Sequence, residues 1–266
     1  MSARRILVIG FGAIAADLVA ALRAEPETEV ALFLRPGSPS RARAPKGLAI
    51  CGDMAEAAAF HPDLVVEAAG HGAVKETVPG CLALGLPVLI ASIGALHDEA
   101  LTTRLAAAAK AHGGRLILAS GAIGGLDYAR AVRPAATLDL AYESRKPPAA
   151  WAGELRALGH APEALSAPVT LFDGTAREAA AAYPQNLNVA AALALAGPGF
   201  EKTRVSVICD PAATGNIHVV RSKSEYGEMR LEIANRPSPS NPKSSWIVAR
   251  ALLAAIEQHF APIVML

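Results

Sequence analysis

The sequence predicts an α/β protein of two domains. Over residues 1–120, short apolar runs alternate with alanine-rich stretches of helical spacing, which is typical of a doubly wound parallel sheet. Over residues 121–242, strand-like runs dominate and few helices separate them, so this part is expected to form an α+β domain with a mostly antiparallel sheet. Residues 243–266 are expected to form a helix that packs back on the first domain.

Continuous apolar runs account for the predicted strands of the first domain. Runs that are continuous rather than alternating are typical of strands covered by helices on both faces. Glycines follow two of the intervening helical stretches, at Gly85 and at Gly113, where helix C-caps are expected. The predicted strands are Arg5–Gly10, Glu29–Leu34, Leu64–Ala69, Leu86–Ala91 and Arg115–Ala119.

The second domain is predicted to contain several partly alternating strands and two clear helices. The helices are expected at Thr175–Ala182 and Leu187–Leu195. A proline-rich link, Asn235–Pro242, ends the domain, and Ser244 is expected to cap a final helix over Trp246–His259. The strands are expected at Leu138–Glu143, Val169–Phe172, Arg204–Cys209, Ile217–Ser222 and Glu228–Ala234.

Composition excludes several classes of function. The 266 residues carry a formal net charge of +1 and no basic run, which argues against nucleic acid or an anionic membrane as a partner. No segment has the length of a membrane span, so a cytoplasmic protein is expected. Cys51, Cys81 and Cys209 are far apart, and no cluster of His, Cys and carboxylates has metal-ligand spacing, so no metal site is expected.

The clearest motif is a glycine-rich turn, Gly10–Ala15, which matches G-x-G-x-x-G/A between a predicted strand and a predicted helix. Gly10 allows the tight turn, Gly12 lets the backbone approach a pyrophosphate, and the small third residue lets helix and strand pack closely. Ala13 and Ile14 begin the helix, whose N-terminal N–H groups favour a phosphate. In this context the motif predicts a Rossmann domain that binds NAD or NADP.

Residues after the next two predicted strands bear on the choice of cofactor and on its binding. NAD-selective domains usually carry Asp or Glu at the end of the second strand, where this chain has Arg35. An arginine can pair with a 2′-phosphate, so NADP is expected to be accepted, although a solvated arginine is nearly as consistent with the sequence. Ala69, Gly70 and His71 end the third strand, at the sheet edge where ligands bind, and Ala69 and Gly70 are predicted to contact the cofactor.

Three further sequence motifs contain residues that secondary structure alone does not require. They are G-A-I-G-G-L-D at Gly121–Asp127, P-Q-N-L-N-V-A at Pro184–Ala190, and G-N-I-H at Gly215–His218. In this order and spacing they resemble the L-aspartate dehydrogenase family, and the resemblance runs over essentially the whole chain. It implies an N-terminal Rossmann domain, a smaller α+β domain that builds the active site and often the dimer interface, and the use of NAD or NADP.

The resemblance also implies an activity and its residues. The family oxidises L-aspartate to iminoaspartate, a precursor of quinolinate in NAD synthesis that otherwise hydrolyses to oxaloacetate and ammonia. Residue by residue, the resemblance assigns Ala122 and Asn188 to the cofactor and His218 to catalysis. A symmetric homodimer is expected, because an antiparallel second domain leaves a sheet face exposed.

The chemistry of amine oxidation gives His218 a specific part. An imine forms from the neutral amine, so a base that titrates near neutrality is useful. His218 is the candidate base, or orients a substrate carboxylate when it is protonated. His71 and Lys243 are candidates for binding the substrate carboxylates, and for Lys243 a solvated side chain is at least as consistent. The sequence leaves open which cofactor is preferred and whether oxidation or reductive amination of oxaloacetate dominates.

Two other functions fit parts of the same pattern. A related two-domain enzyme, such as a homoserine dehydrogenase or a dihydrodipicolinate reductase, would use the same cofactor on a semialdehyde or a ring imine. A non-catalytic dinucleotide-binding regulator would bind the cofactor without turnover. Such a regulator has no need of His218 within G-N-I-H.

Overall fold

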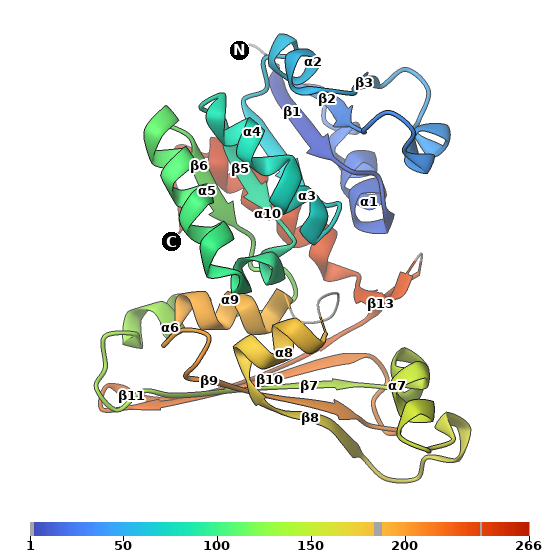
Figure 1. Ribbon diagram of the computed structural model, residues 1–266, viewed down its shortest axis with the longest axis vertical. Coiled ribbons are helices and arrows are strands. Elements are labelled where there is room, and N and C mark those ends of the chain that lie inside the picture. Colours follow the sequence, from blue (N-terminus) through green and yellow to red (C-terminus); the bar gives the residue numbers. More distant parts are fainter. Residues whose placement is uncertain (1–2, 184–187, 240, 266) are drawn as a thin grey trace. The chain divides into compact units, whose positions relative to one another are not determined.

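The protein divides into two compact units, each with its own sheet (Figure 1). The computed structural model describes residues 3–183, 188–239 and 241–265, except for the side chains of residues 242 and 243. Unit 1 comprises Met1–Gly121 and Val248–Leu266, and unit 2 comprises Ala122–Ile247. The sequence had indicated boundaries after residues 120 and 242, so the second boundary lies five residues further along the chain in the structure.

Unit 1 contains a six-stranded sheet in the order β3-β2-β1-β4-β5-β6, in which every neighbouring pair is parallel. This is the strand order of a Rossmann fold, with its topological switch point between β1 and β4, and it confirms the predicted fold class. The strands are β1 (Arg4–Ile9), β2 (Thr28–Phe33), β3 (Ala49–Cys51), β4 (Leu64–Glu67), β5 (Pro87–Ile90) and β6 (Arg115–Leu118). The sequence did not predict β3, because its three residues are too few to form an apolar run.

Helices cover both faces of this sheet. One face packs against α1 and α10, and its core includes Leu18 and Val19 of α1 together with Leu252 and Ile256 of α10. Figure 1 shows α10 in red behind β5 and β6, on the side opposite α4 and α5. The C-terminal helix is therefore part of the core of unit 1. The helices are α1 (Ala13–Leu22), α2 (Met54–Ala59), α3 (His71–Glu76), α4 (Val78–Ala83), α5 (Glu99–His112) and α10 (Ile247–Phe260).

Unit 2 contains a five-stranded sheet in the order β11-β10-β7-β9-β8. The β7–β9 pair is parallel and the other neighbouring pairs are antiparallel, which confirms a mostly antiparallel sheet. Each of these strands overlaps one of the predicted strands. They are β7 (Asp139–Lys146), β8 (Val169–Thr175), β9 (Thr203–Cys209), β10 (Asn216–Ser224) and β11 (Gly227–Asn235).

The helices of unit 2 lie mainly over one face of its sheet. Figure 1 shows α8 and α9 over this face, whereas the opposite face has no described helix across it. The N-terminus of α8 is closed by a capping box between Thr175 and Glu178. Beyond the two predicted helices, the structure contains α6 and α7, which are too short to show a clear helical period in the sequence. The bounds are α6 (Leu126–Val132), α7 (Ala152–Ala157), α8 (Ala176–Ala182) and α9 (Asn188–Ala196).

The segment before α10 differs from the prediction. A small antiparallel pair, β12 (Pro237–Ser238) and β13 (Asn241–Ser245), occupies much of the proline-rich link. Lys243 and Ser244 therefore lie in a strand, and α10 begins only at Ile247. The hydroxyl of Ser244 accepts a hydrogen bond from Nδ2 of Asn241 at 3.1 Å, within the hairpin. Ser244 is thus not the N-cap of the last helix, and Lys243 is not at the start of that helix.

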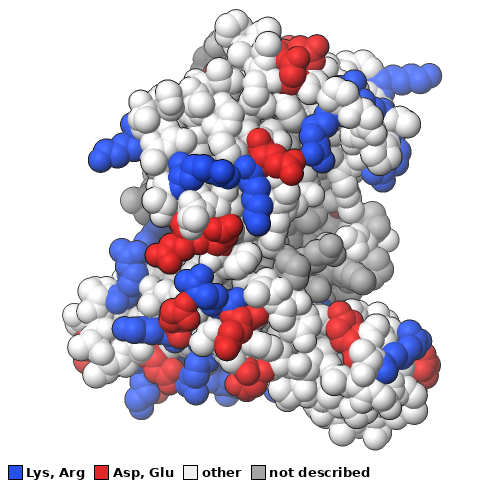
Figure 2. All heavy atoms as spheres, viewed as in Figure 1, with Lys and Arg blue, Asp and Glu red and all other residues white. Residues whose placement is uncertain are grey.

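The surface carries charges of both signs. Figure 2 shows Lys and Arg side chains interspersed with Asp and Glu on the face in view, in keeping with the net charge of +1. No helix in the described part of the chain is both long and apolar enough to cross a membrane. Among the same residues, no group of three or more His, Cys, Asp or Glu side chains is arranged to hold a metal ion.

Candidate active site

The glycine-rich turn of unit 1 is shaped by a close approach of two strand ends. Gly10 has a φ of +91°, and a Cβ at this position would lie 2.5 Å from the Cβ of Ala69, in the loop after β4. A side chain is therefore excluded by both the backbone conformation and the contact. This approach brings the ends of β1 and β4 together at the switch point of the sheet.

The next residues leave space at the N-terminus of α1. Gly12 is the N-cap, is exposed, and has no atom within 4 Å of where a Cβ would be. Ala13 and Ile14 form the first turn, where backbone N–H groups lack intrahelical acceptors. Ala15 is fully buried in the core of unit 1. This arrangement fits the pyrophosphate of a dinucleotide. There is open space at Gly12, backbone N–H groups lie beside it, and Ala15 is packed in the core.

A buried carboxyl group organises the neighbouring loops. Glu67, at the end of β4, is 0% exposed. Its Oε1 accepts hydrogen bonds from the backbone N–H groups of Ala69 at 2.8 Å and Gly70 at 2.7 Å, and from the Ser92 hydroxyl at 2.9 Å. Its Oε2 accepts from the backbone N–H of Ser92 at 3.0 Å. Glu67 thus ties the loop after β4 to the loop after β5, and its four acceptor contacts match a carboxylate.

The sequence placed Glu67 in the predicted strand that ends at the ligand-binding edge of the sheet, but no role was predicted for it. It ends a strand whose other residues are apolar and fully buried. A carboxylate in such a run must find internal partners. A charged residue within a continuous apolar strand therefore indicates a buried group that organises its surroundings, as Glu67 does.

Arg35 lies on the loop after β2, where the sequence predicted it. The Arg35 side chain is exposed, and its Nη1 lies 2.7 Å from Oε2 of Glu76 at the end of α3. The neighbouring Arg41 is committed to the backbone, because its Nε and Nη2 donate to the Leu34 carbonyl at 3.0 and 2.7 Å. Arg35 is thus available to a solvent-borne anion only in competition with Glu76.

In unit 2, His218 lies on the buried face of β10. It is 4% exposed, and its Nδ1 is 2.7 Å from the hydroxyl oxygen of Tyr142 on β7. Its Nε2 is buried and has no hydrogen-bond partner among the described residues. Burial, and next the positive charge of Lys146, lower the pKa of His218 to about 4. The ring is therefore neutral at neutral pH.

Strand alternation places further polar side chains beside His218. Tyr142, Ser144 and Lys146 are all buried on β7, at every second position. Ser144 pairs directly with His218 across the sheet. Burial raises the pKa of Tyr142 above its usual range, so its hydroxyl stays protonated. No role was predicted for these residues, although the alternation along β7 indicates that they share one face of the sheet.

Lys146 and Trp151 form a second contact in this cluster. Lys146 is 4% exposed, and its Nζ lies 5.3 Å from the centre of the Trp151 ring. This geometry is that of a cation–π contact. Trp151 is 0% exposed, and its indole Nε1 has no hydrogen-bond partner among the described residues. A buried cation therefore lies on the same sheet face as His218.

The other predicted residues of unit 2 lie at the ends of elements. Asn188 is the first residue of α9. The carbonyl of Ala122 accepts a hydrogen bond from Nδ2 of Asn235 at 2.9 Å. Nδ2 of the buried Asn216 donates to the Ser245 hydroxyl at 2.9 Å, while its Oδ1 has no partner in the described part of the chain.

The two residues predicted to bind carboxylates are in different units. His71 begins α3 in unit 1 and is partly buried. Lys243 lies in β13 of unit 2, and its side chain is outside the described part of the structure. The structure thus brings Gly10 and Ala69 together in unit 1, and His218, Tyr142 and Ser144 together in unit 2.

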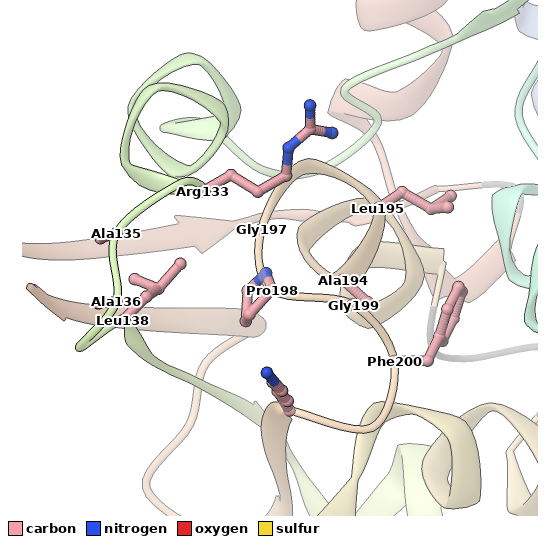
Figure 3. A pocket seen from close by; sticks show the side chains of 11 residues that line it. Arg133, Ala135, Ala136, Leu138, Ala194, Leu195, Gly197, Pro198, Gly199 and Phe200 are labelled. Atoms are coloured by element: carbon pink, nitrogen blue, oxygen red, sulfur yellow. The ribbon is translucent and has the colours of Figure 1, made fainter.

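Two cavities of unit 2 are lined by residues other than those around His218. One cavity of about 410 Å³ is lined by the loop after α6, the end of α9 and the turn before β9, and Figure 3 shows its side chains. It carries two cations, Arg133 and Lys202, and none of the residues around His218. A second hollow of about 350 Å³ lies on the opposite face of the sheet and includes Arg145 and Val219. The candidate site therefore rests on the buried polar cluster and not on either cavity.

Comparison with known proteins connects both units to dehydrogenases. The family model described as "Aspartate dehydrogenase, C-terminal" matches residues 127–259. The model described as "Homoserine dehydrogenase, NAD binding domain" matches residues 10–119. These ranges contain His218 and the glycine-rich turn, respectively.

Similar proteins match the chain along nearly its full length. L-aspartate dehydrogenase 2 of Bordetella pertussis is 48% identical over 259 residues, which cover 97% of each chain. L-aspartate dehydrogenase of Ruegeria pomeroyi is 44% identical over 259 residues, covering 97% of this chain and 94% of the relative. Among solved structures, aspartate dehydrogenase from Thermotoga maritima superposes with a TM-score of 0.77 at 26% identity, covering 98% of this chain and 99% of its own.

The contacts of Glu67 predict a role in dinucleotide binding. In Glu67→Gln, an amide NH₂ replaces one acceptor oxygen and faces an N–H or O–H donor, so the loops after β4 and β5 lose part of their connection. One buried donor left unpaired costs about 1–3 kcal/mol. We expect weaker binding of NADH and NADPH, measured by titration calorimetry on protein whose circular dichroism is unchanged.

The matched control is Glu56→Gln, which removes a similar carboxylate contact to the backbone N–H of Gly52, in an exposed loop. This variant should bind both dinucleotides as the unaltered protein does. Unchanged dissociation constants for a folded Glu67→Gln protein would contradict the role assigned to Glu67.

The buried His218 predicts acid-sensitive stability. Its folded pKa of about 4 lies below the ordinary value of 6.5, so between these values the folded state binds fewer protons than the unfolded state. Stability is therefore fully present above pH 6.5 and is lost as the pH falls toward 4, by up to about 3 kcal/mol. His218→Gln should lose correspondingly less stability over this range.

Urea denaturation followed by tryptophan fluorescence measures this effect, because Trp151 and Trp246, the two tryptophans, both belong to unit 2. His160→Gln, at an exposed histidine of the same unit, is the control and should keep the original pH dependence. Parallel pH curves for His218→Gln and the unaltered protein would contradict the prediction.

Proposed function

The chain belongs to the aspartate dehydrogenase family, and on that premise we propose that it oxidises L-aspartate to iminoaspartate with NAD or NADP. It is an NAD(P)-dependent oxidoreductase that acts on a CH–NH₂ donor. The observation that carries the proposal is the extent of the similarity, because an alignment along nearly the whole chain spans both the glycine-rich turn and the strand of His218.

The reaction removes a hydride and a proton from the substrate. The Cα–H bond of L-aspartate breaks with its electron pair, an N–H bond of the neutral amine loses a proton, and a C=N bond forms. When bound, the nicotinamide supplies the acceptor for the hydride. The chain must therefore hold the amine in its neutral form and accept its proton.

His218 is the residue that we propose for this proton transfer. Its Nε2 has no partner among the described residues, and its Nδ1 hydrogen-bonds with the hydroxyl of Tyr142. When Nδ1–H donates to Tyr142, Nε2 carries the lone pair that a base needs. The low pKa keeps this lone pair free at neutral pH.

Several backbone positions are proposed to hold the dinucleotide. Gly10, Gly12, Ala13 and Ile14 would surround the pyrophosphate, and the close contact of Gly10 with Ala69 supports a shared binding edge with Gly70. From unit 2, Ala122 and Asn188 are proposed to contact the cofactor, on the strength of the family motifs in which they stand. His71 and Lys243 stay proposals for substrate binding.

The fate of the product follows from its chemistry. Iminoaspartate hydrolyses in water to oxaloacetate and ammonia, and reductive amination of oxaloacetate is the same reaction reversed. We propose that captured iminoaspartate feeds NAD synthesis through quinolinate, as the family resemblance implies.

A homodimer and a cytoplasmic location complete the proposal. The sheet face of unit 2 without a described helix carries Ile217 and Val219 among ion pairs such as Arg145–Asp210, a mixed surface that suits a second copy of the chain. The three cysteines, Cys51, Cys81 and Cys209, are free and buried, which supports a reducing compartment.

Absorbance at 340 nm tests the activity directly. With L-aspartate, reduced cofactor should form from NAD, from NADP or from both, and D-aspartate and L-glutamate should give little or none. His218→Ala should lower kcat/KM by about 10²- to 10⁴-fold, because it removes the general base. His160→Ala is the control, since His160 is exposed.

The same assay separates the rival functions. Turnover of homoserine without turnover of L-aspartate would indicate a related dehydrogenase. Saturable dinucleotide binding without turnover of any amino acid would indicate a regulator. Absence of an L-aspartate signal with both cofactors would refute the proposed function.

The ion pair of Arg35 with Glu76 predicts how cofactor preference can be changed. Arg35→Ala should lower the ratio of NADP to NAD turnover, because it removes a cation that can pair with the 2′-phosphate. Glu76→Gln should raise that ratio, because Arg35 no longer has a competing carboxylate. The double variant should resemble Arg35→Ala, and an unchanged ratio in Arg35→Ala would contradict the role of Arg35.

A further inference from the structure

We propose that Lys146 and the indole N–H of Trp151 form an anion site that binds a carboxylate of the substrate beside His218. This inference rests on the proposed function for the identity of the substrate, an amino dicarboxylate. It concerns residues that lie outside the family motifs, in β7 and in the turn that follows it.

The position of Lys146 is the first observation. Its side chain is almost fully buried on the covered face of the sheet, and its ammonium group can donate up to three hydrogen bonds. The Trp151 ring supports the cation at 5.3 Å and holds the long side chain in place. Lys146 is therefore a preorganised positive charge inside unit 2.

The unpaired polar atoms around it are the second observation. Nε1 of Trp151 is a buried donor and Oδ1 of Asn216 a buried acceptor, and neither has a partner among the described residues. Nε2 of His218 is a third such atom. Leaving each of these unpaired costs about 1–3 kcal/mol, so a ligand that pairs them all would bind there favourably.

The types of these groups match an amino acid anion. Lys146 and Trp151 can only donate hydrogen bonds, as a carboxylate requires. Oδ1 of Asn216 accepts, and so does Nε2 of His218 when Nδ1 carries the proton, as an amine requires. The cluster therefore offers donors for a carboxylate and acceptors for the neighbouring amine.

Sheet register brings Lys146, Asn216 and His218 close together, and the Trp151 ring is placed by its contact with Lys146. Ser144 pairs with His218, and Ile217 pairs with Arg145, so Lys146 and Asn216 are the next residues along their strands. Diagonal neighbours on one face of a sheet lie about 7–8 Å apart. The Lys146 charge also contributes, after burial, to the low pKa of His218, which is consistent with this proximity.

The experiment compares Lys146→Met with Lys223→Met. Methionine removes the buried charge and keeps a similar volume, whereas Lys223 is an exposed lysine of β10 paired with Glu228. Binding of succinate, a dicarboxylate without an amine, and of L-aspartate is measured by calorimetry, together with KM and kcat for L-aspartate. Lys146→Met should weaken the binding of succinate and of L-aspartate and raise KM by about 10- to 150-fold, because one charged hydrogen bond is lost. The change in kcat should be smaller.

Trp151→Phe is the second variant, which retains the ring and removes only the N–H. It should weaken the binding of succinate by a smaller factor than Lys146→Met does. This variant keeps the proposal testable if Lys146→Met does not fold. The dissociation constant of NADPH should not change in either variant, as expected for a carboxylate site and not for general disruption.

The outcomes separate this inference from the proposed function. If the unaltered protein oxidises L-aspartate and folded Lys146→Met keeps the same KM and succinate affinity, the anion site is overturned and the function stands. If succinate binding depends on Lys146 but L-aspartate is not oxidised, the function fails and the anion site stands. Should Lys146→Met not fold, unchanged succinate binding in Trp151→Phe overturns the proposed site.

Discussion

A buried polar group has lost its water, and it must find another partner or destabilise the fold. Two buried polar groups of this protein, Glu67 and His218, meet that constraint in opposite ways. In unit 1, Glu67 is fully buried, yet both of its oxygens accept hydrogen bonds from the loops after β4 and β5. In unit 2, His218, Trp151 and Asn216 each keep a buried atom without a partner among the described residues. Hydrogen bonds thus connect two loops at the edge of the first sheet, whereas the second sheet keeps buried donors and acceptors that the proposed substrate would pair.

The proposed base, His218, has an environment that disfavours its protonated form. Burial and the nearby Lys146 hold the pKa of His218 at about 4, which is low for accepting a proton at neutral pH. A carboxylate bound at Lys146 would neutralise that positive charge and raise the basicity of His218. Tyr142, whose own pKa is raised by burial, stays protonated and holds the ring in place.

Most of the fold could be predicted from local patterns, and the exceptions have physical causes. Continuous apolar runs identified β1, β2, β4, β5 and β6, because strands covered on both faces need apolar residues at every position. The three residues of β3 are too few to form such a run, and α6 and α7 are too short to show a helical period. Ser244 has the composition of an N-cap, but its hydroxyl is used within the β12–β13 hairpin. Short elements are decided by contacts that a local pattern does not contain.

Residues that are neighbours in the chain were enough to predict the α/β plan of two units, the glycine-rich turn and the family, and to single out His218 as the candidate base. The surroundings of these residues became known from the three-dimensional structure. Glu67 meets Ser92 across 25 positions, and Tyr142 meets His218 across 76. The neighbourhood of Lys146 likewise depends on the register between β7 and β10. Strand pairing sets such contacts, since side chains distant in the chain come together only when the sheet has formed.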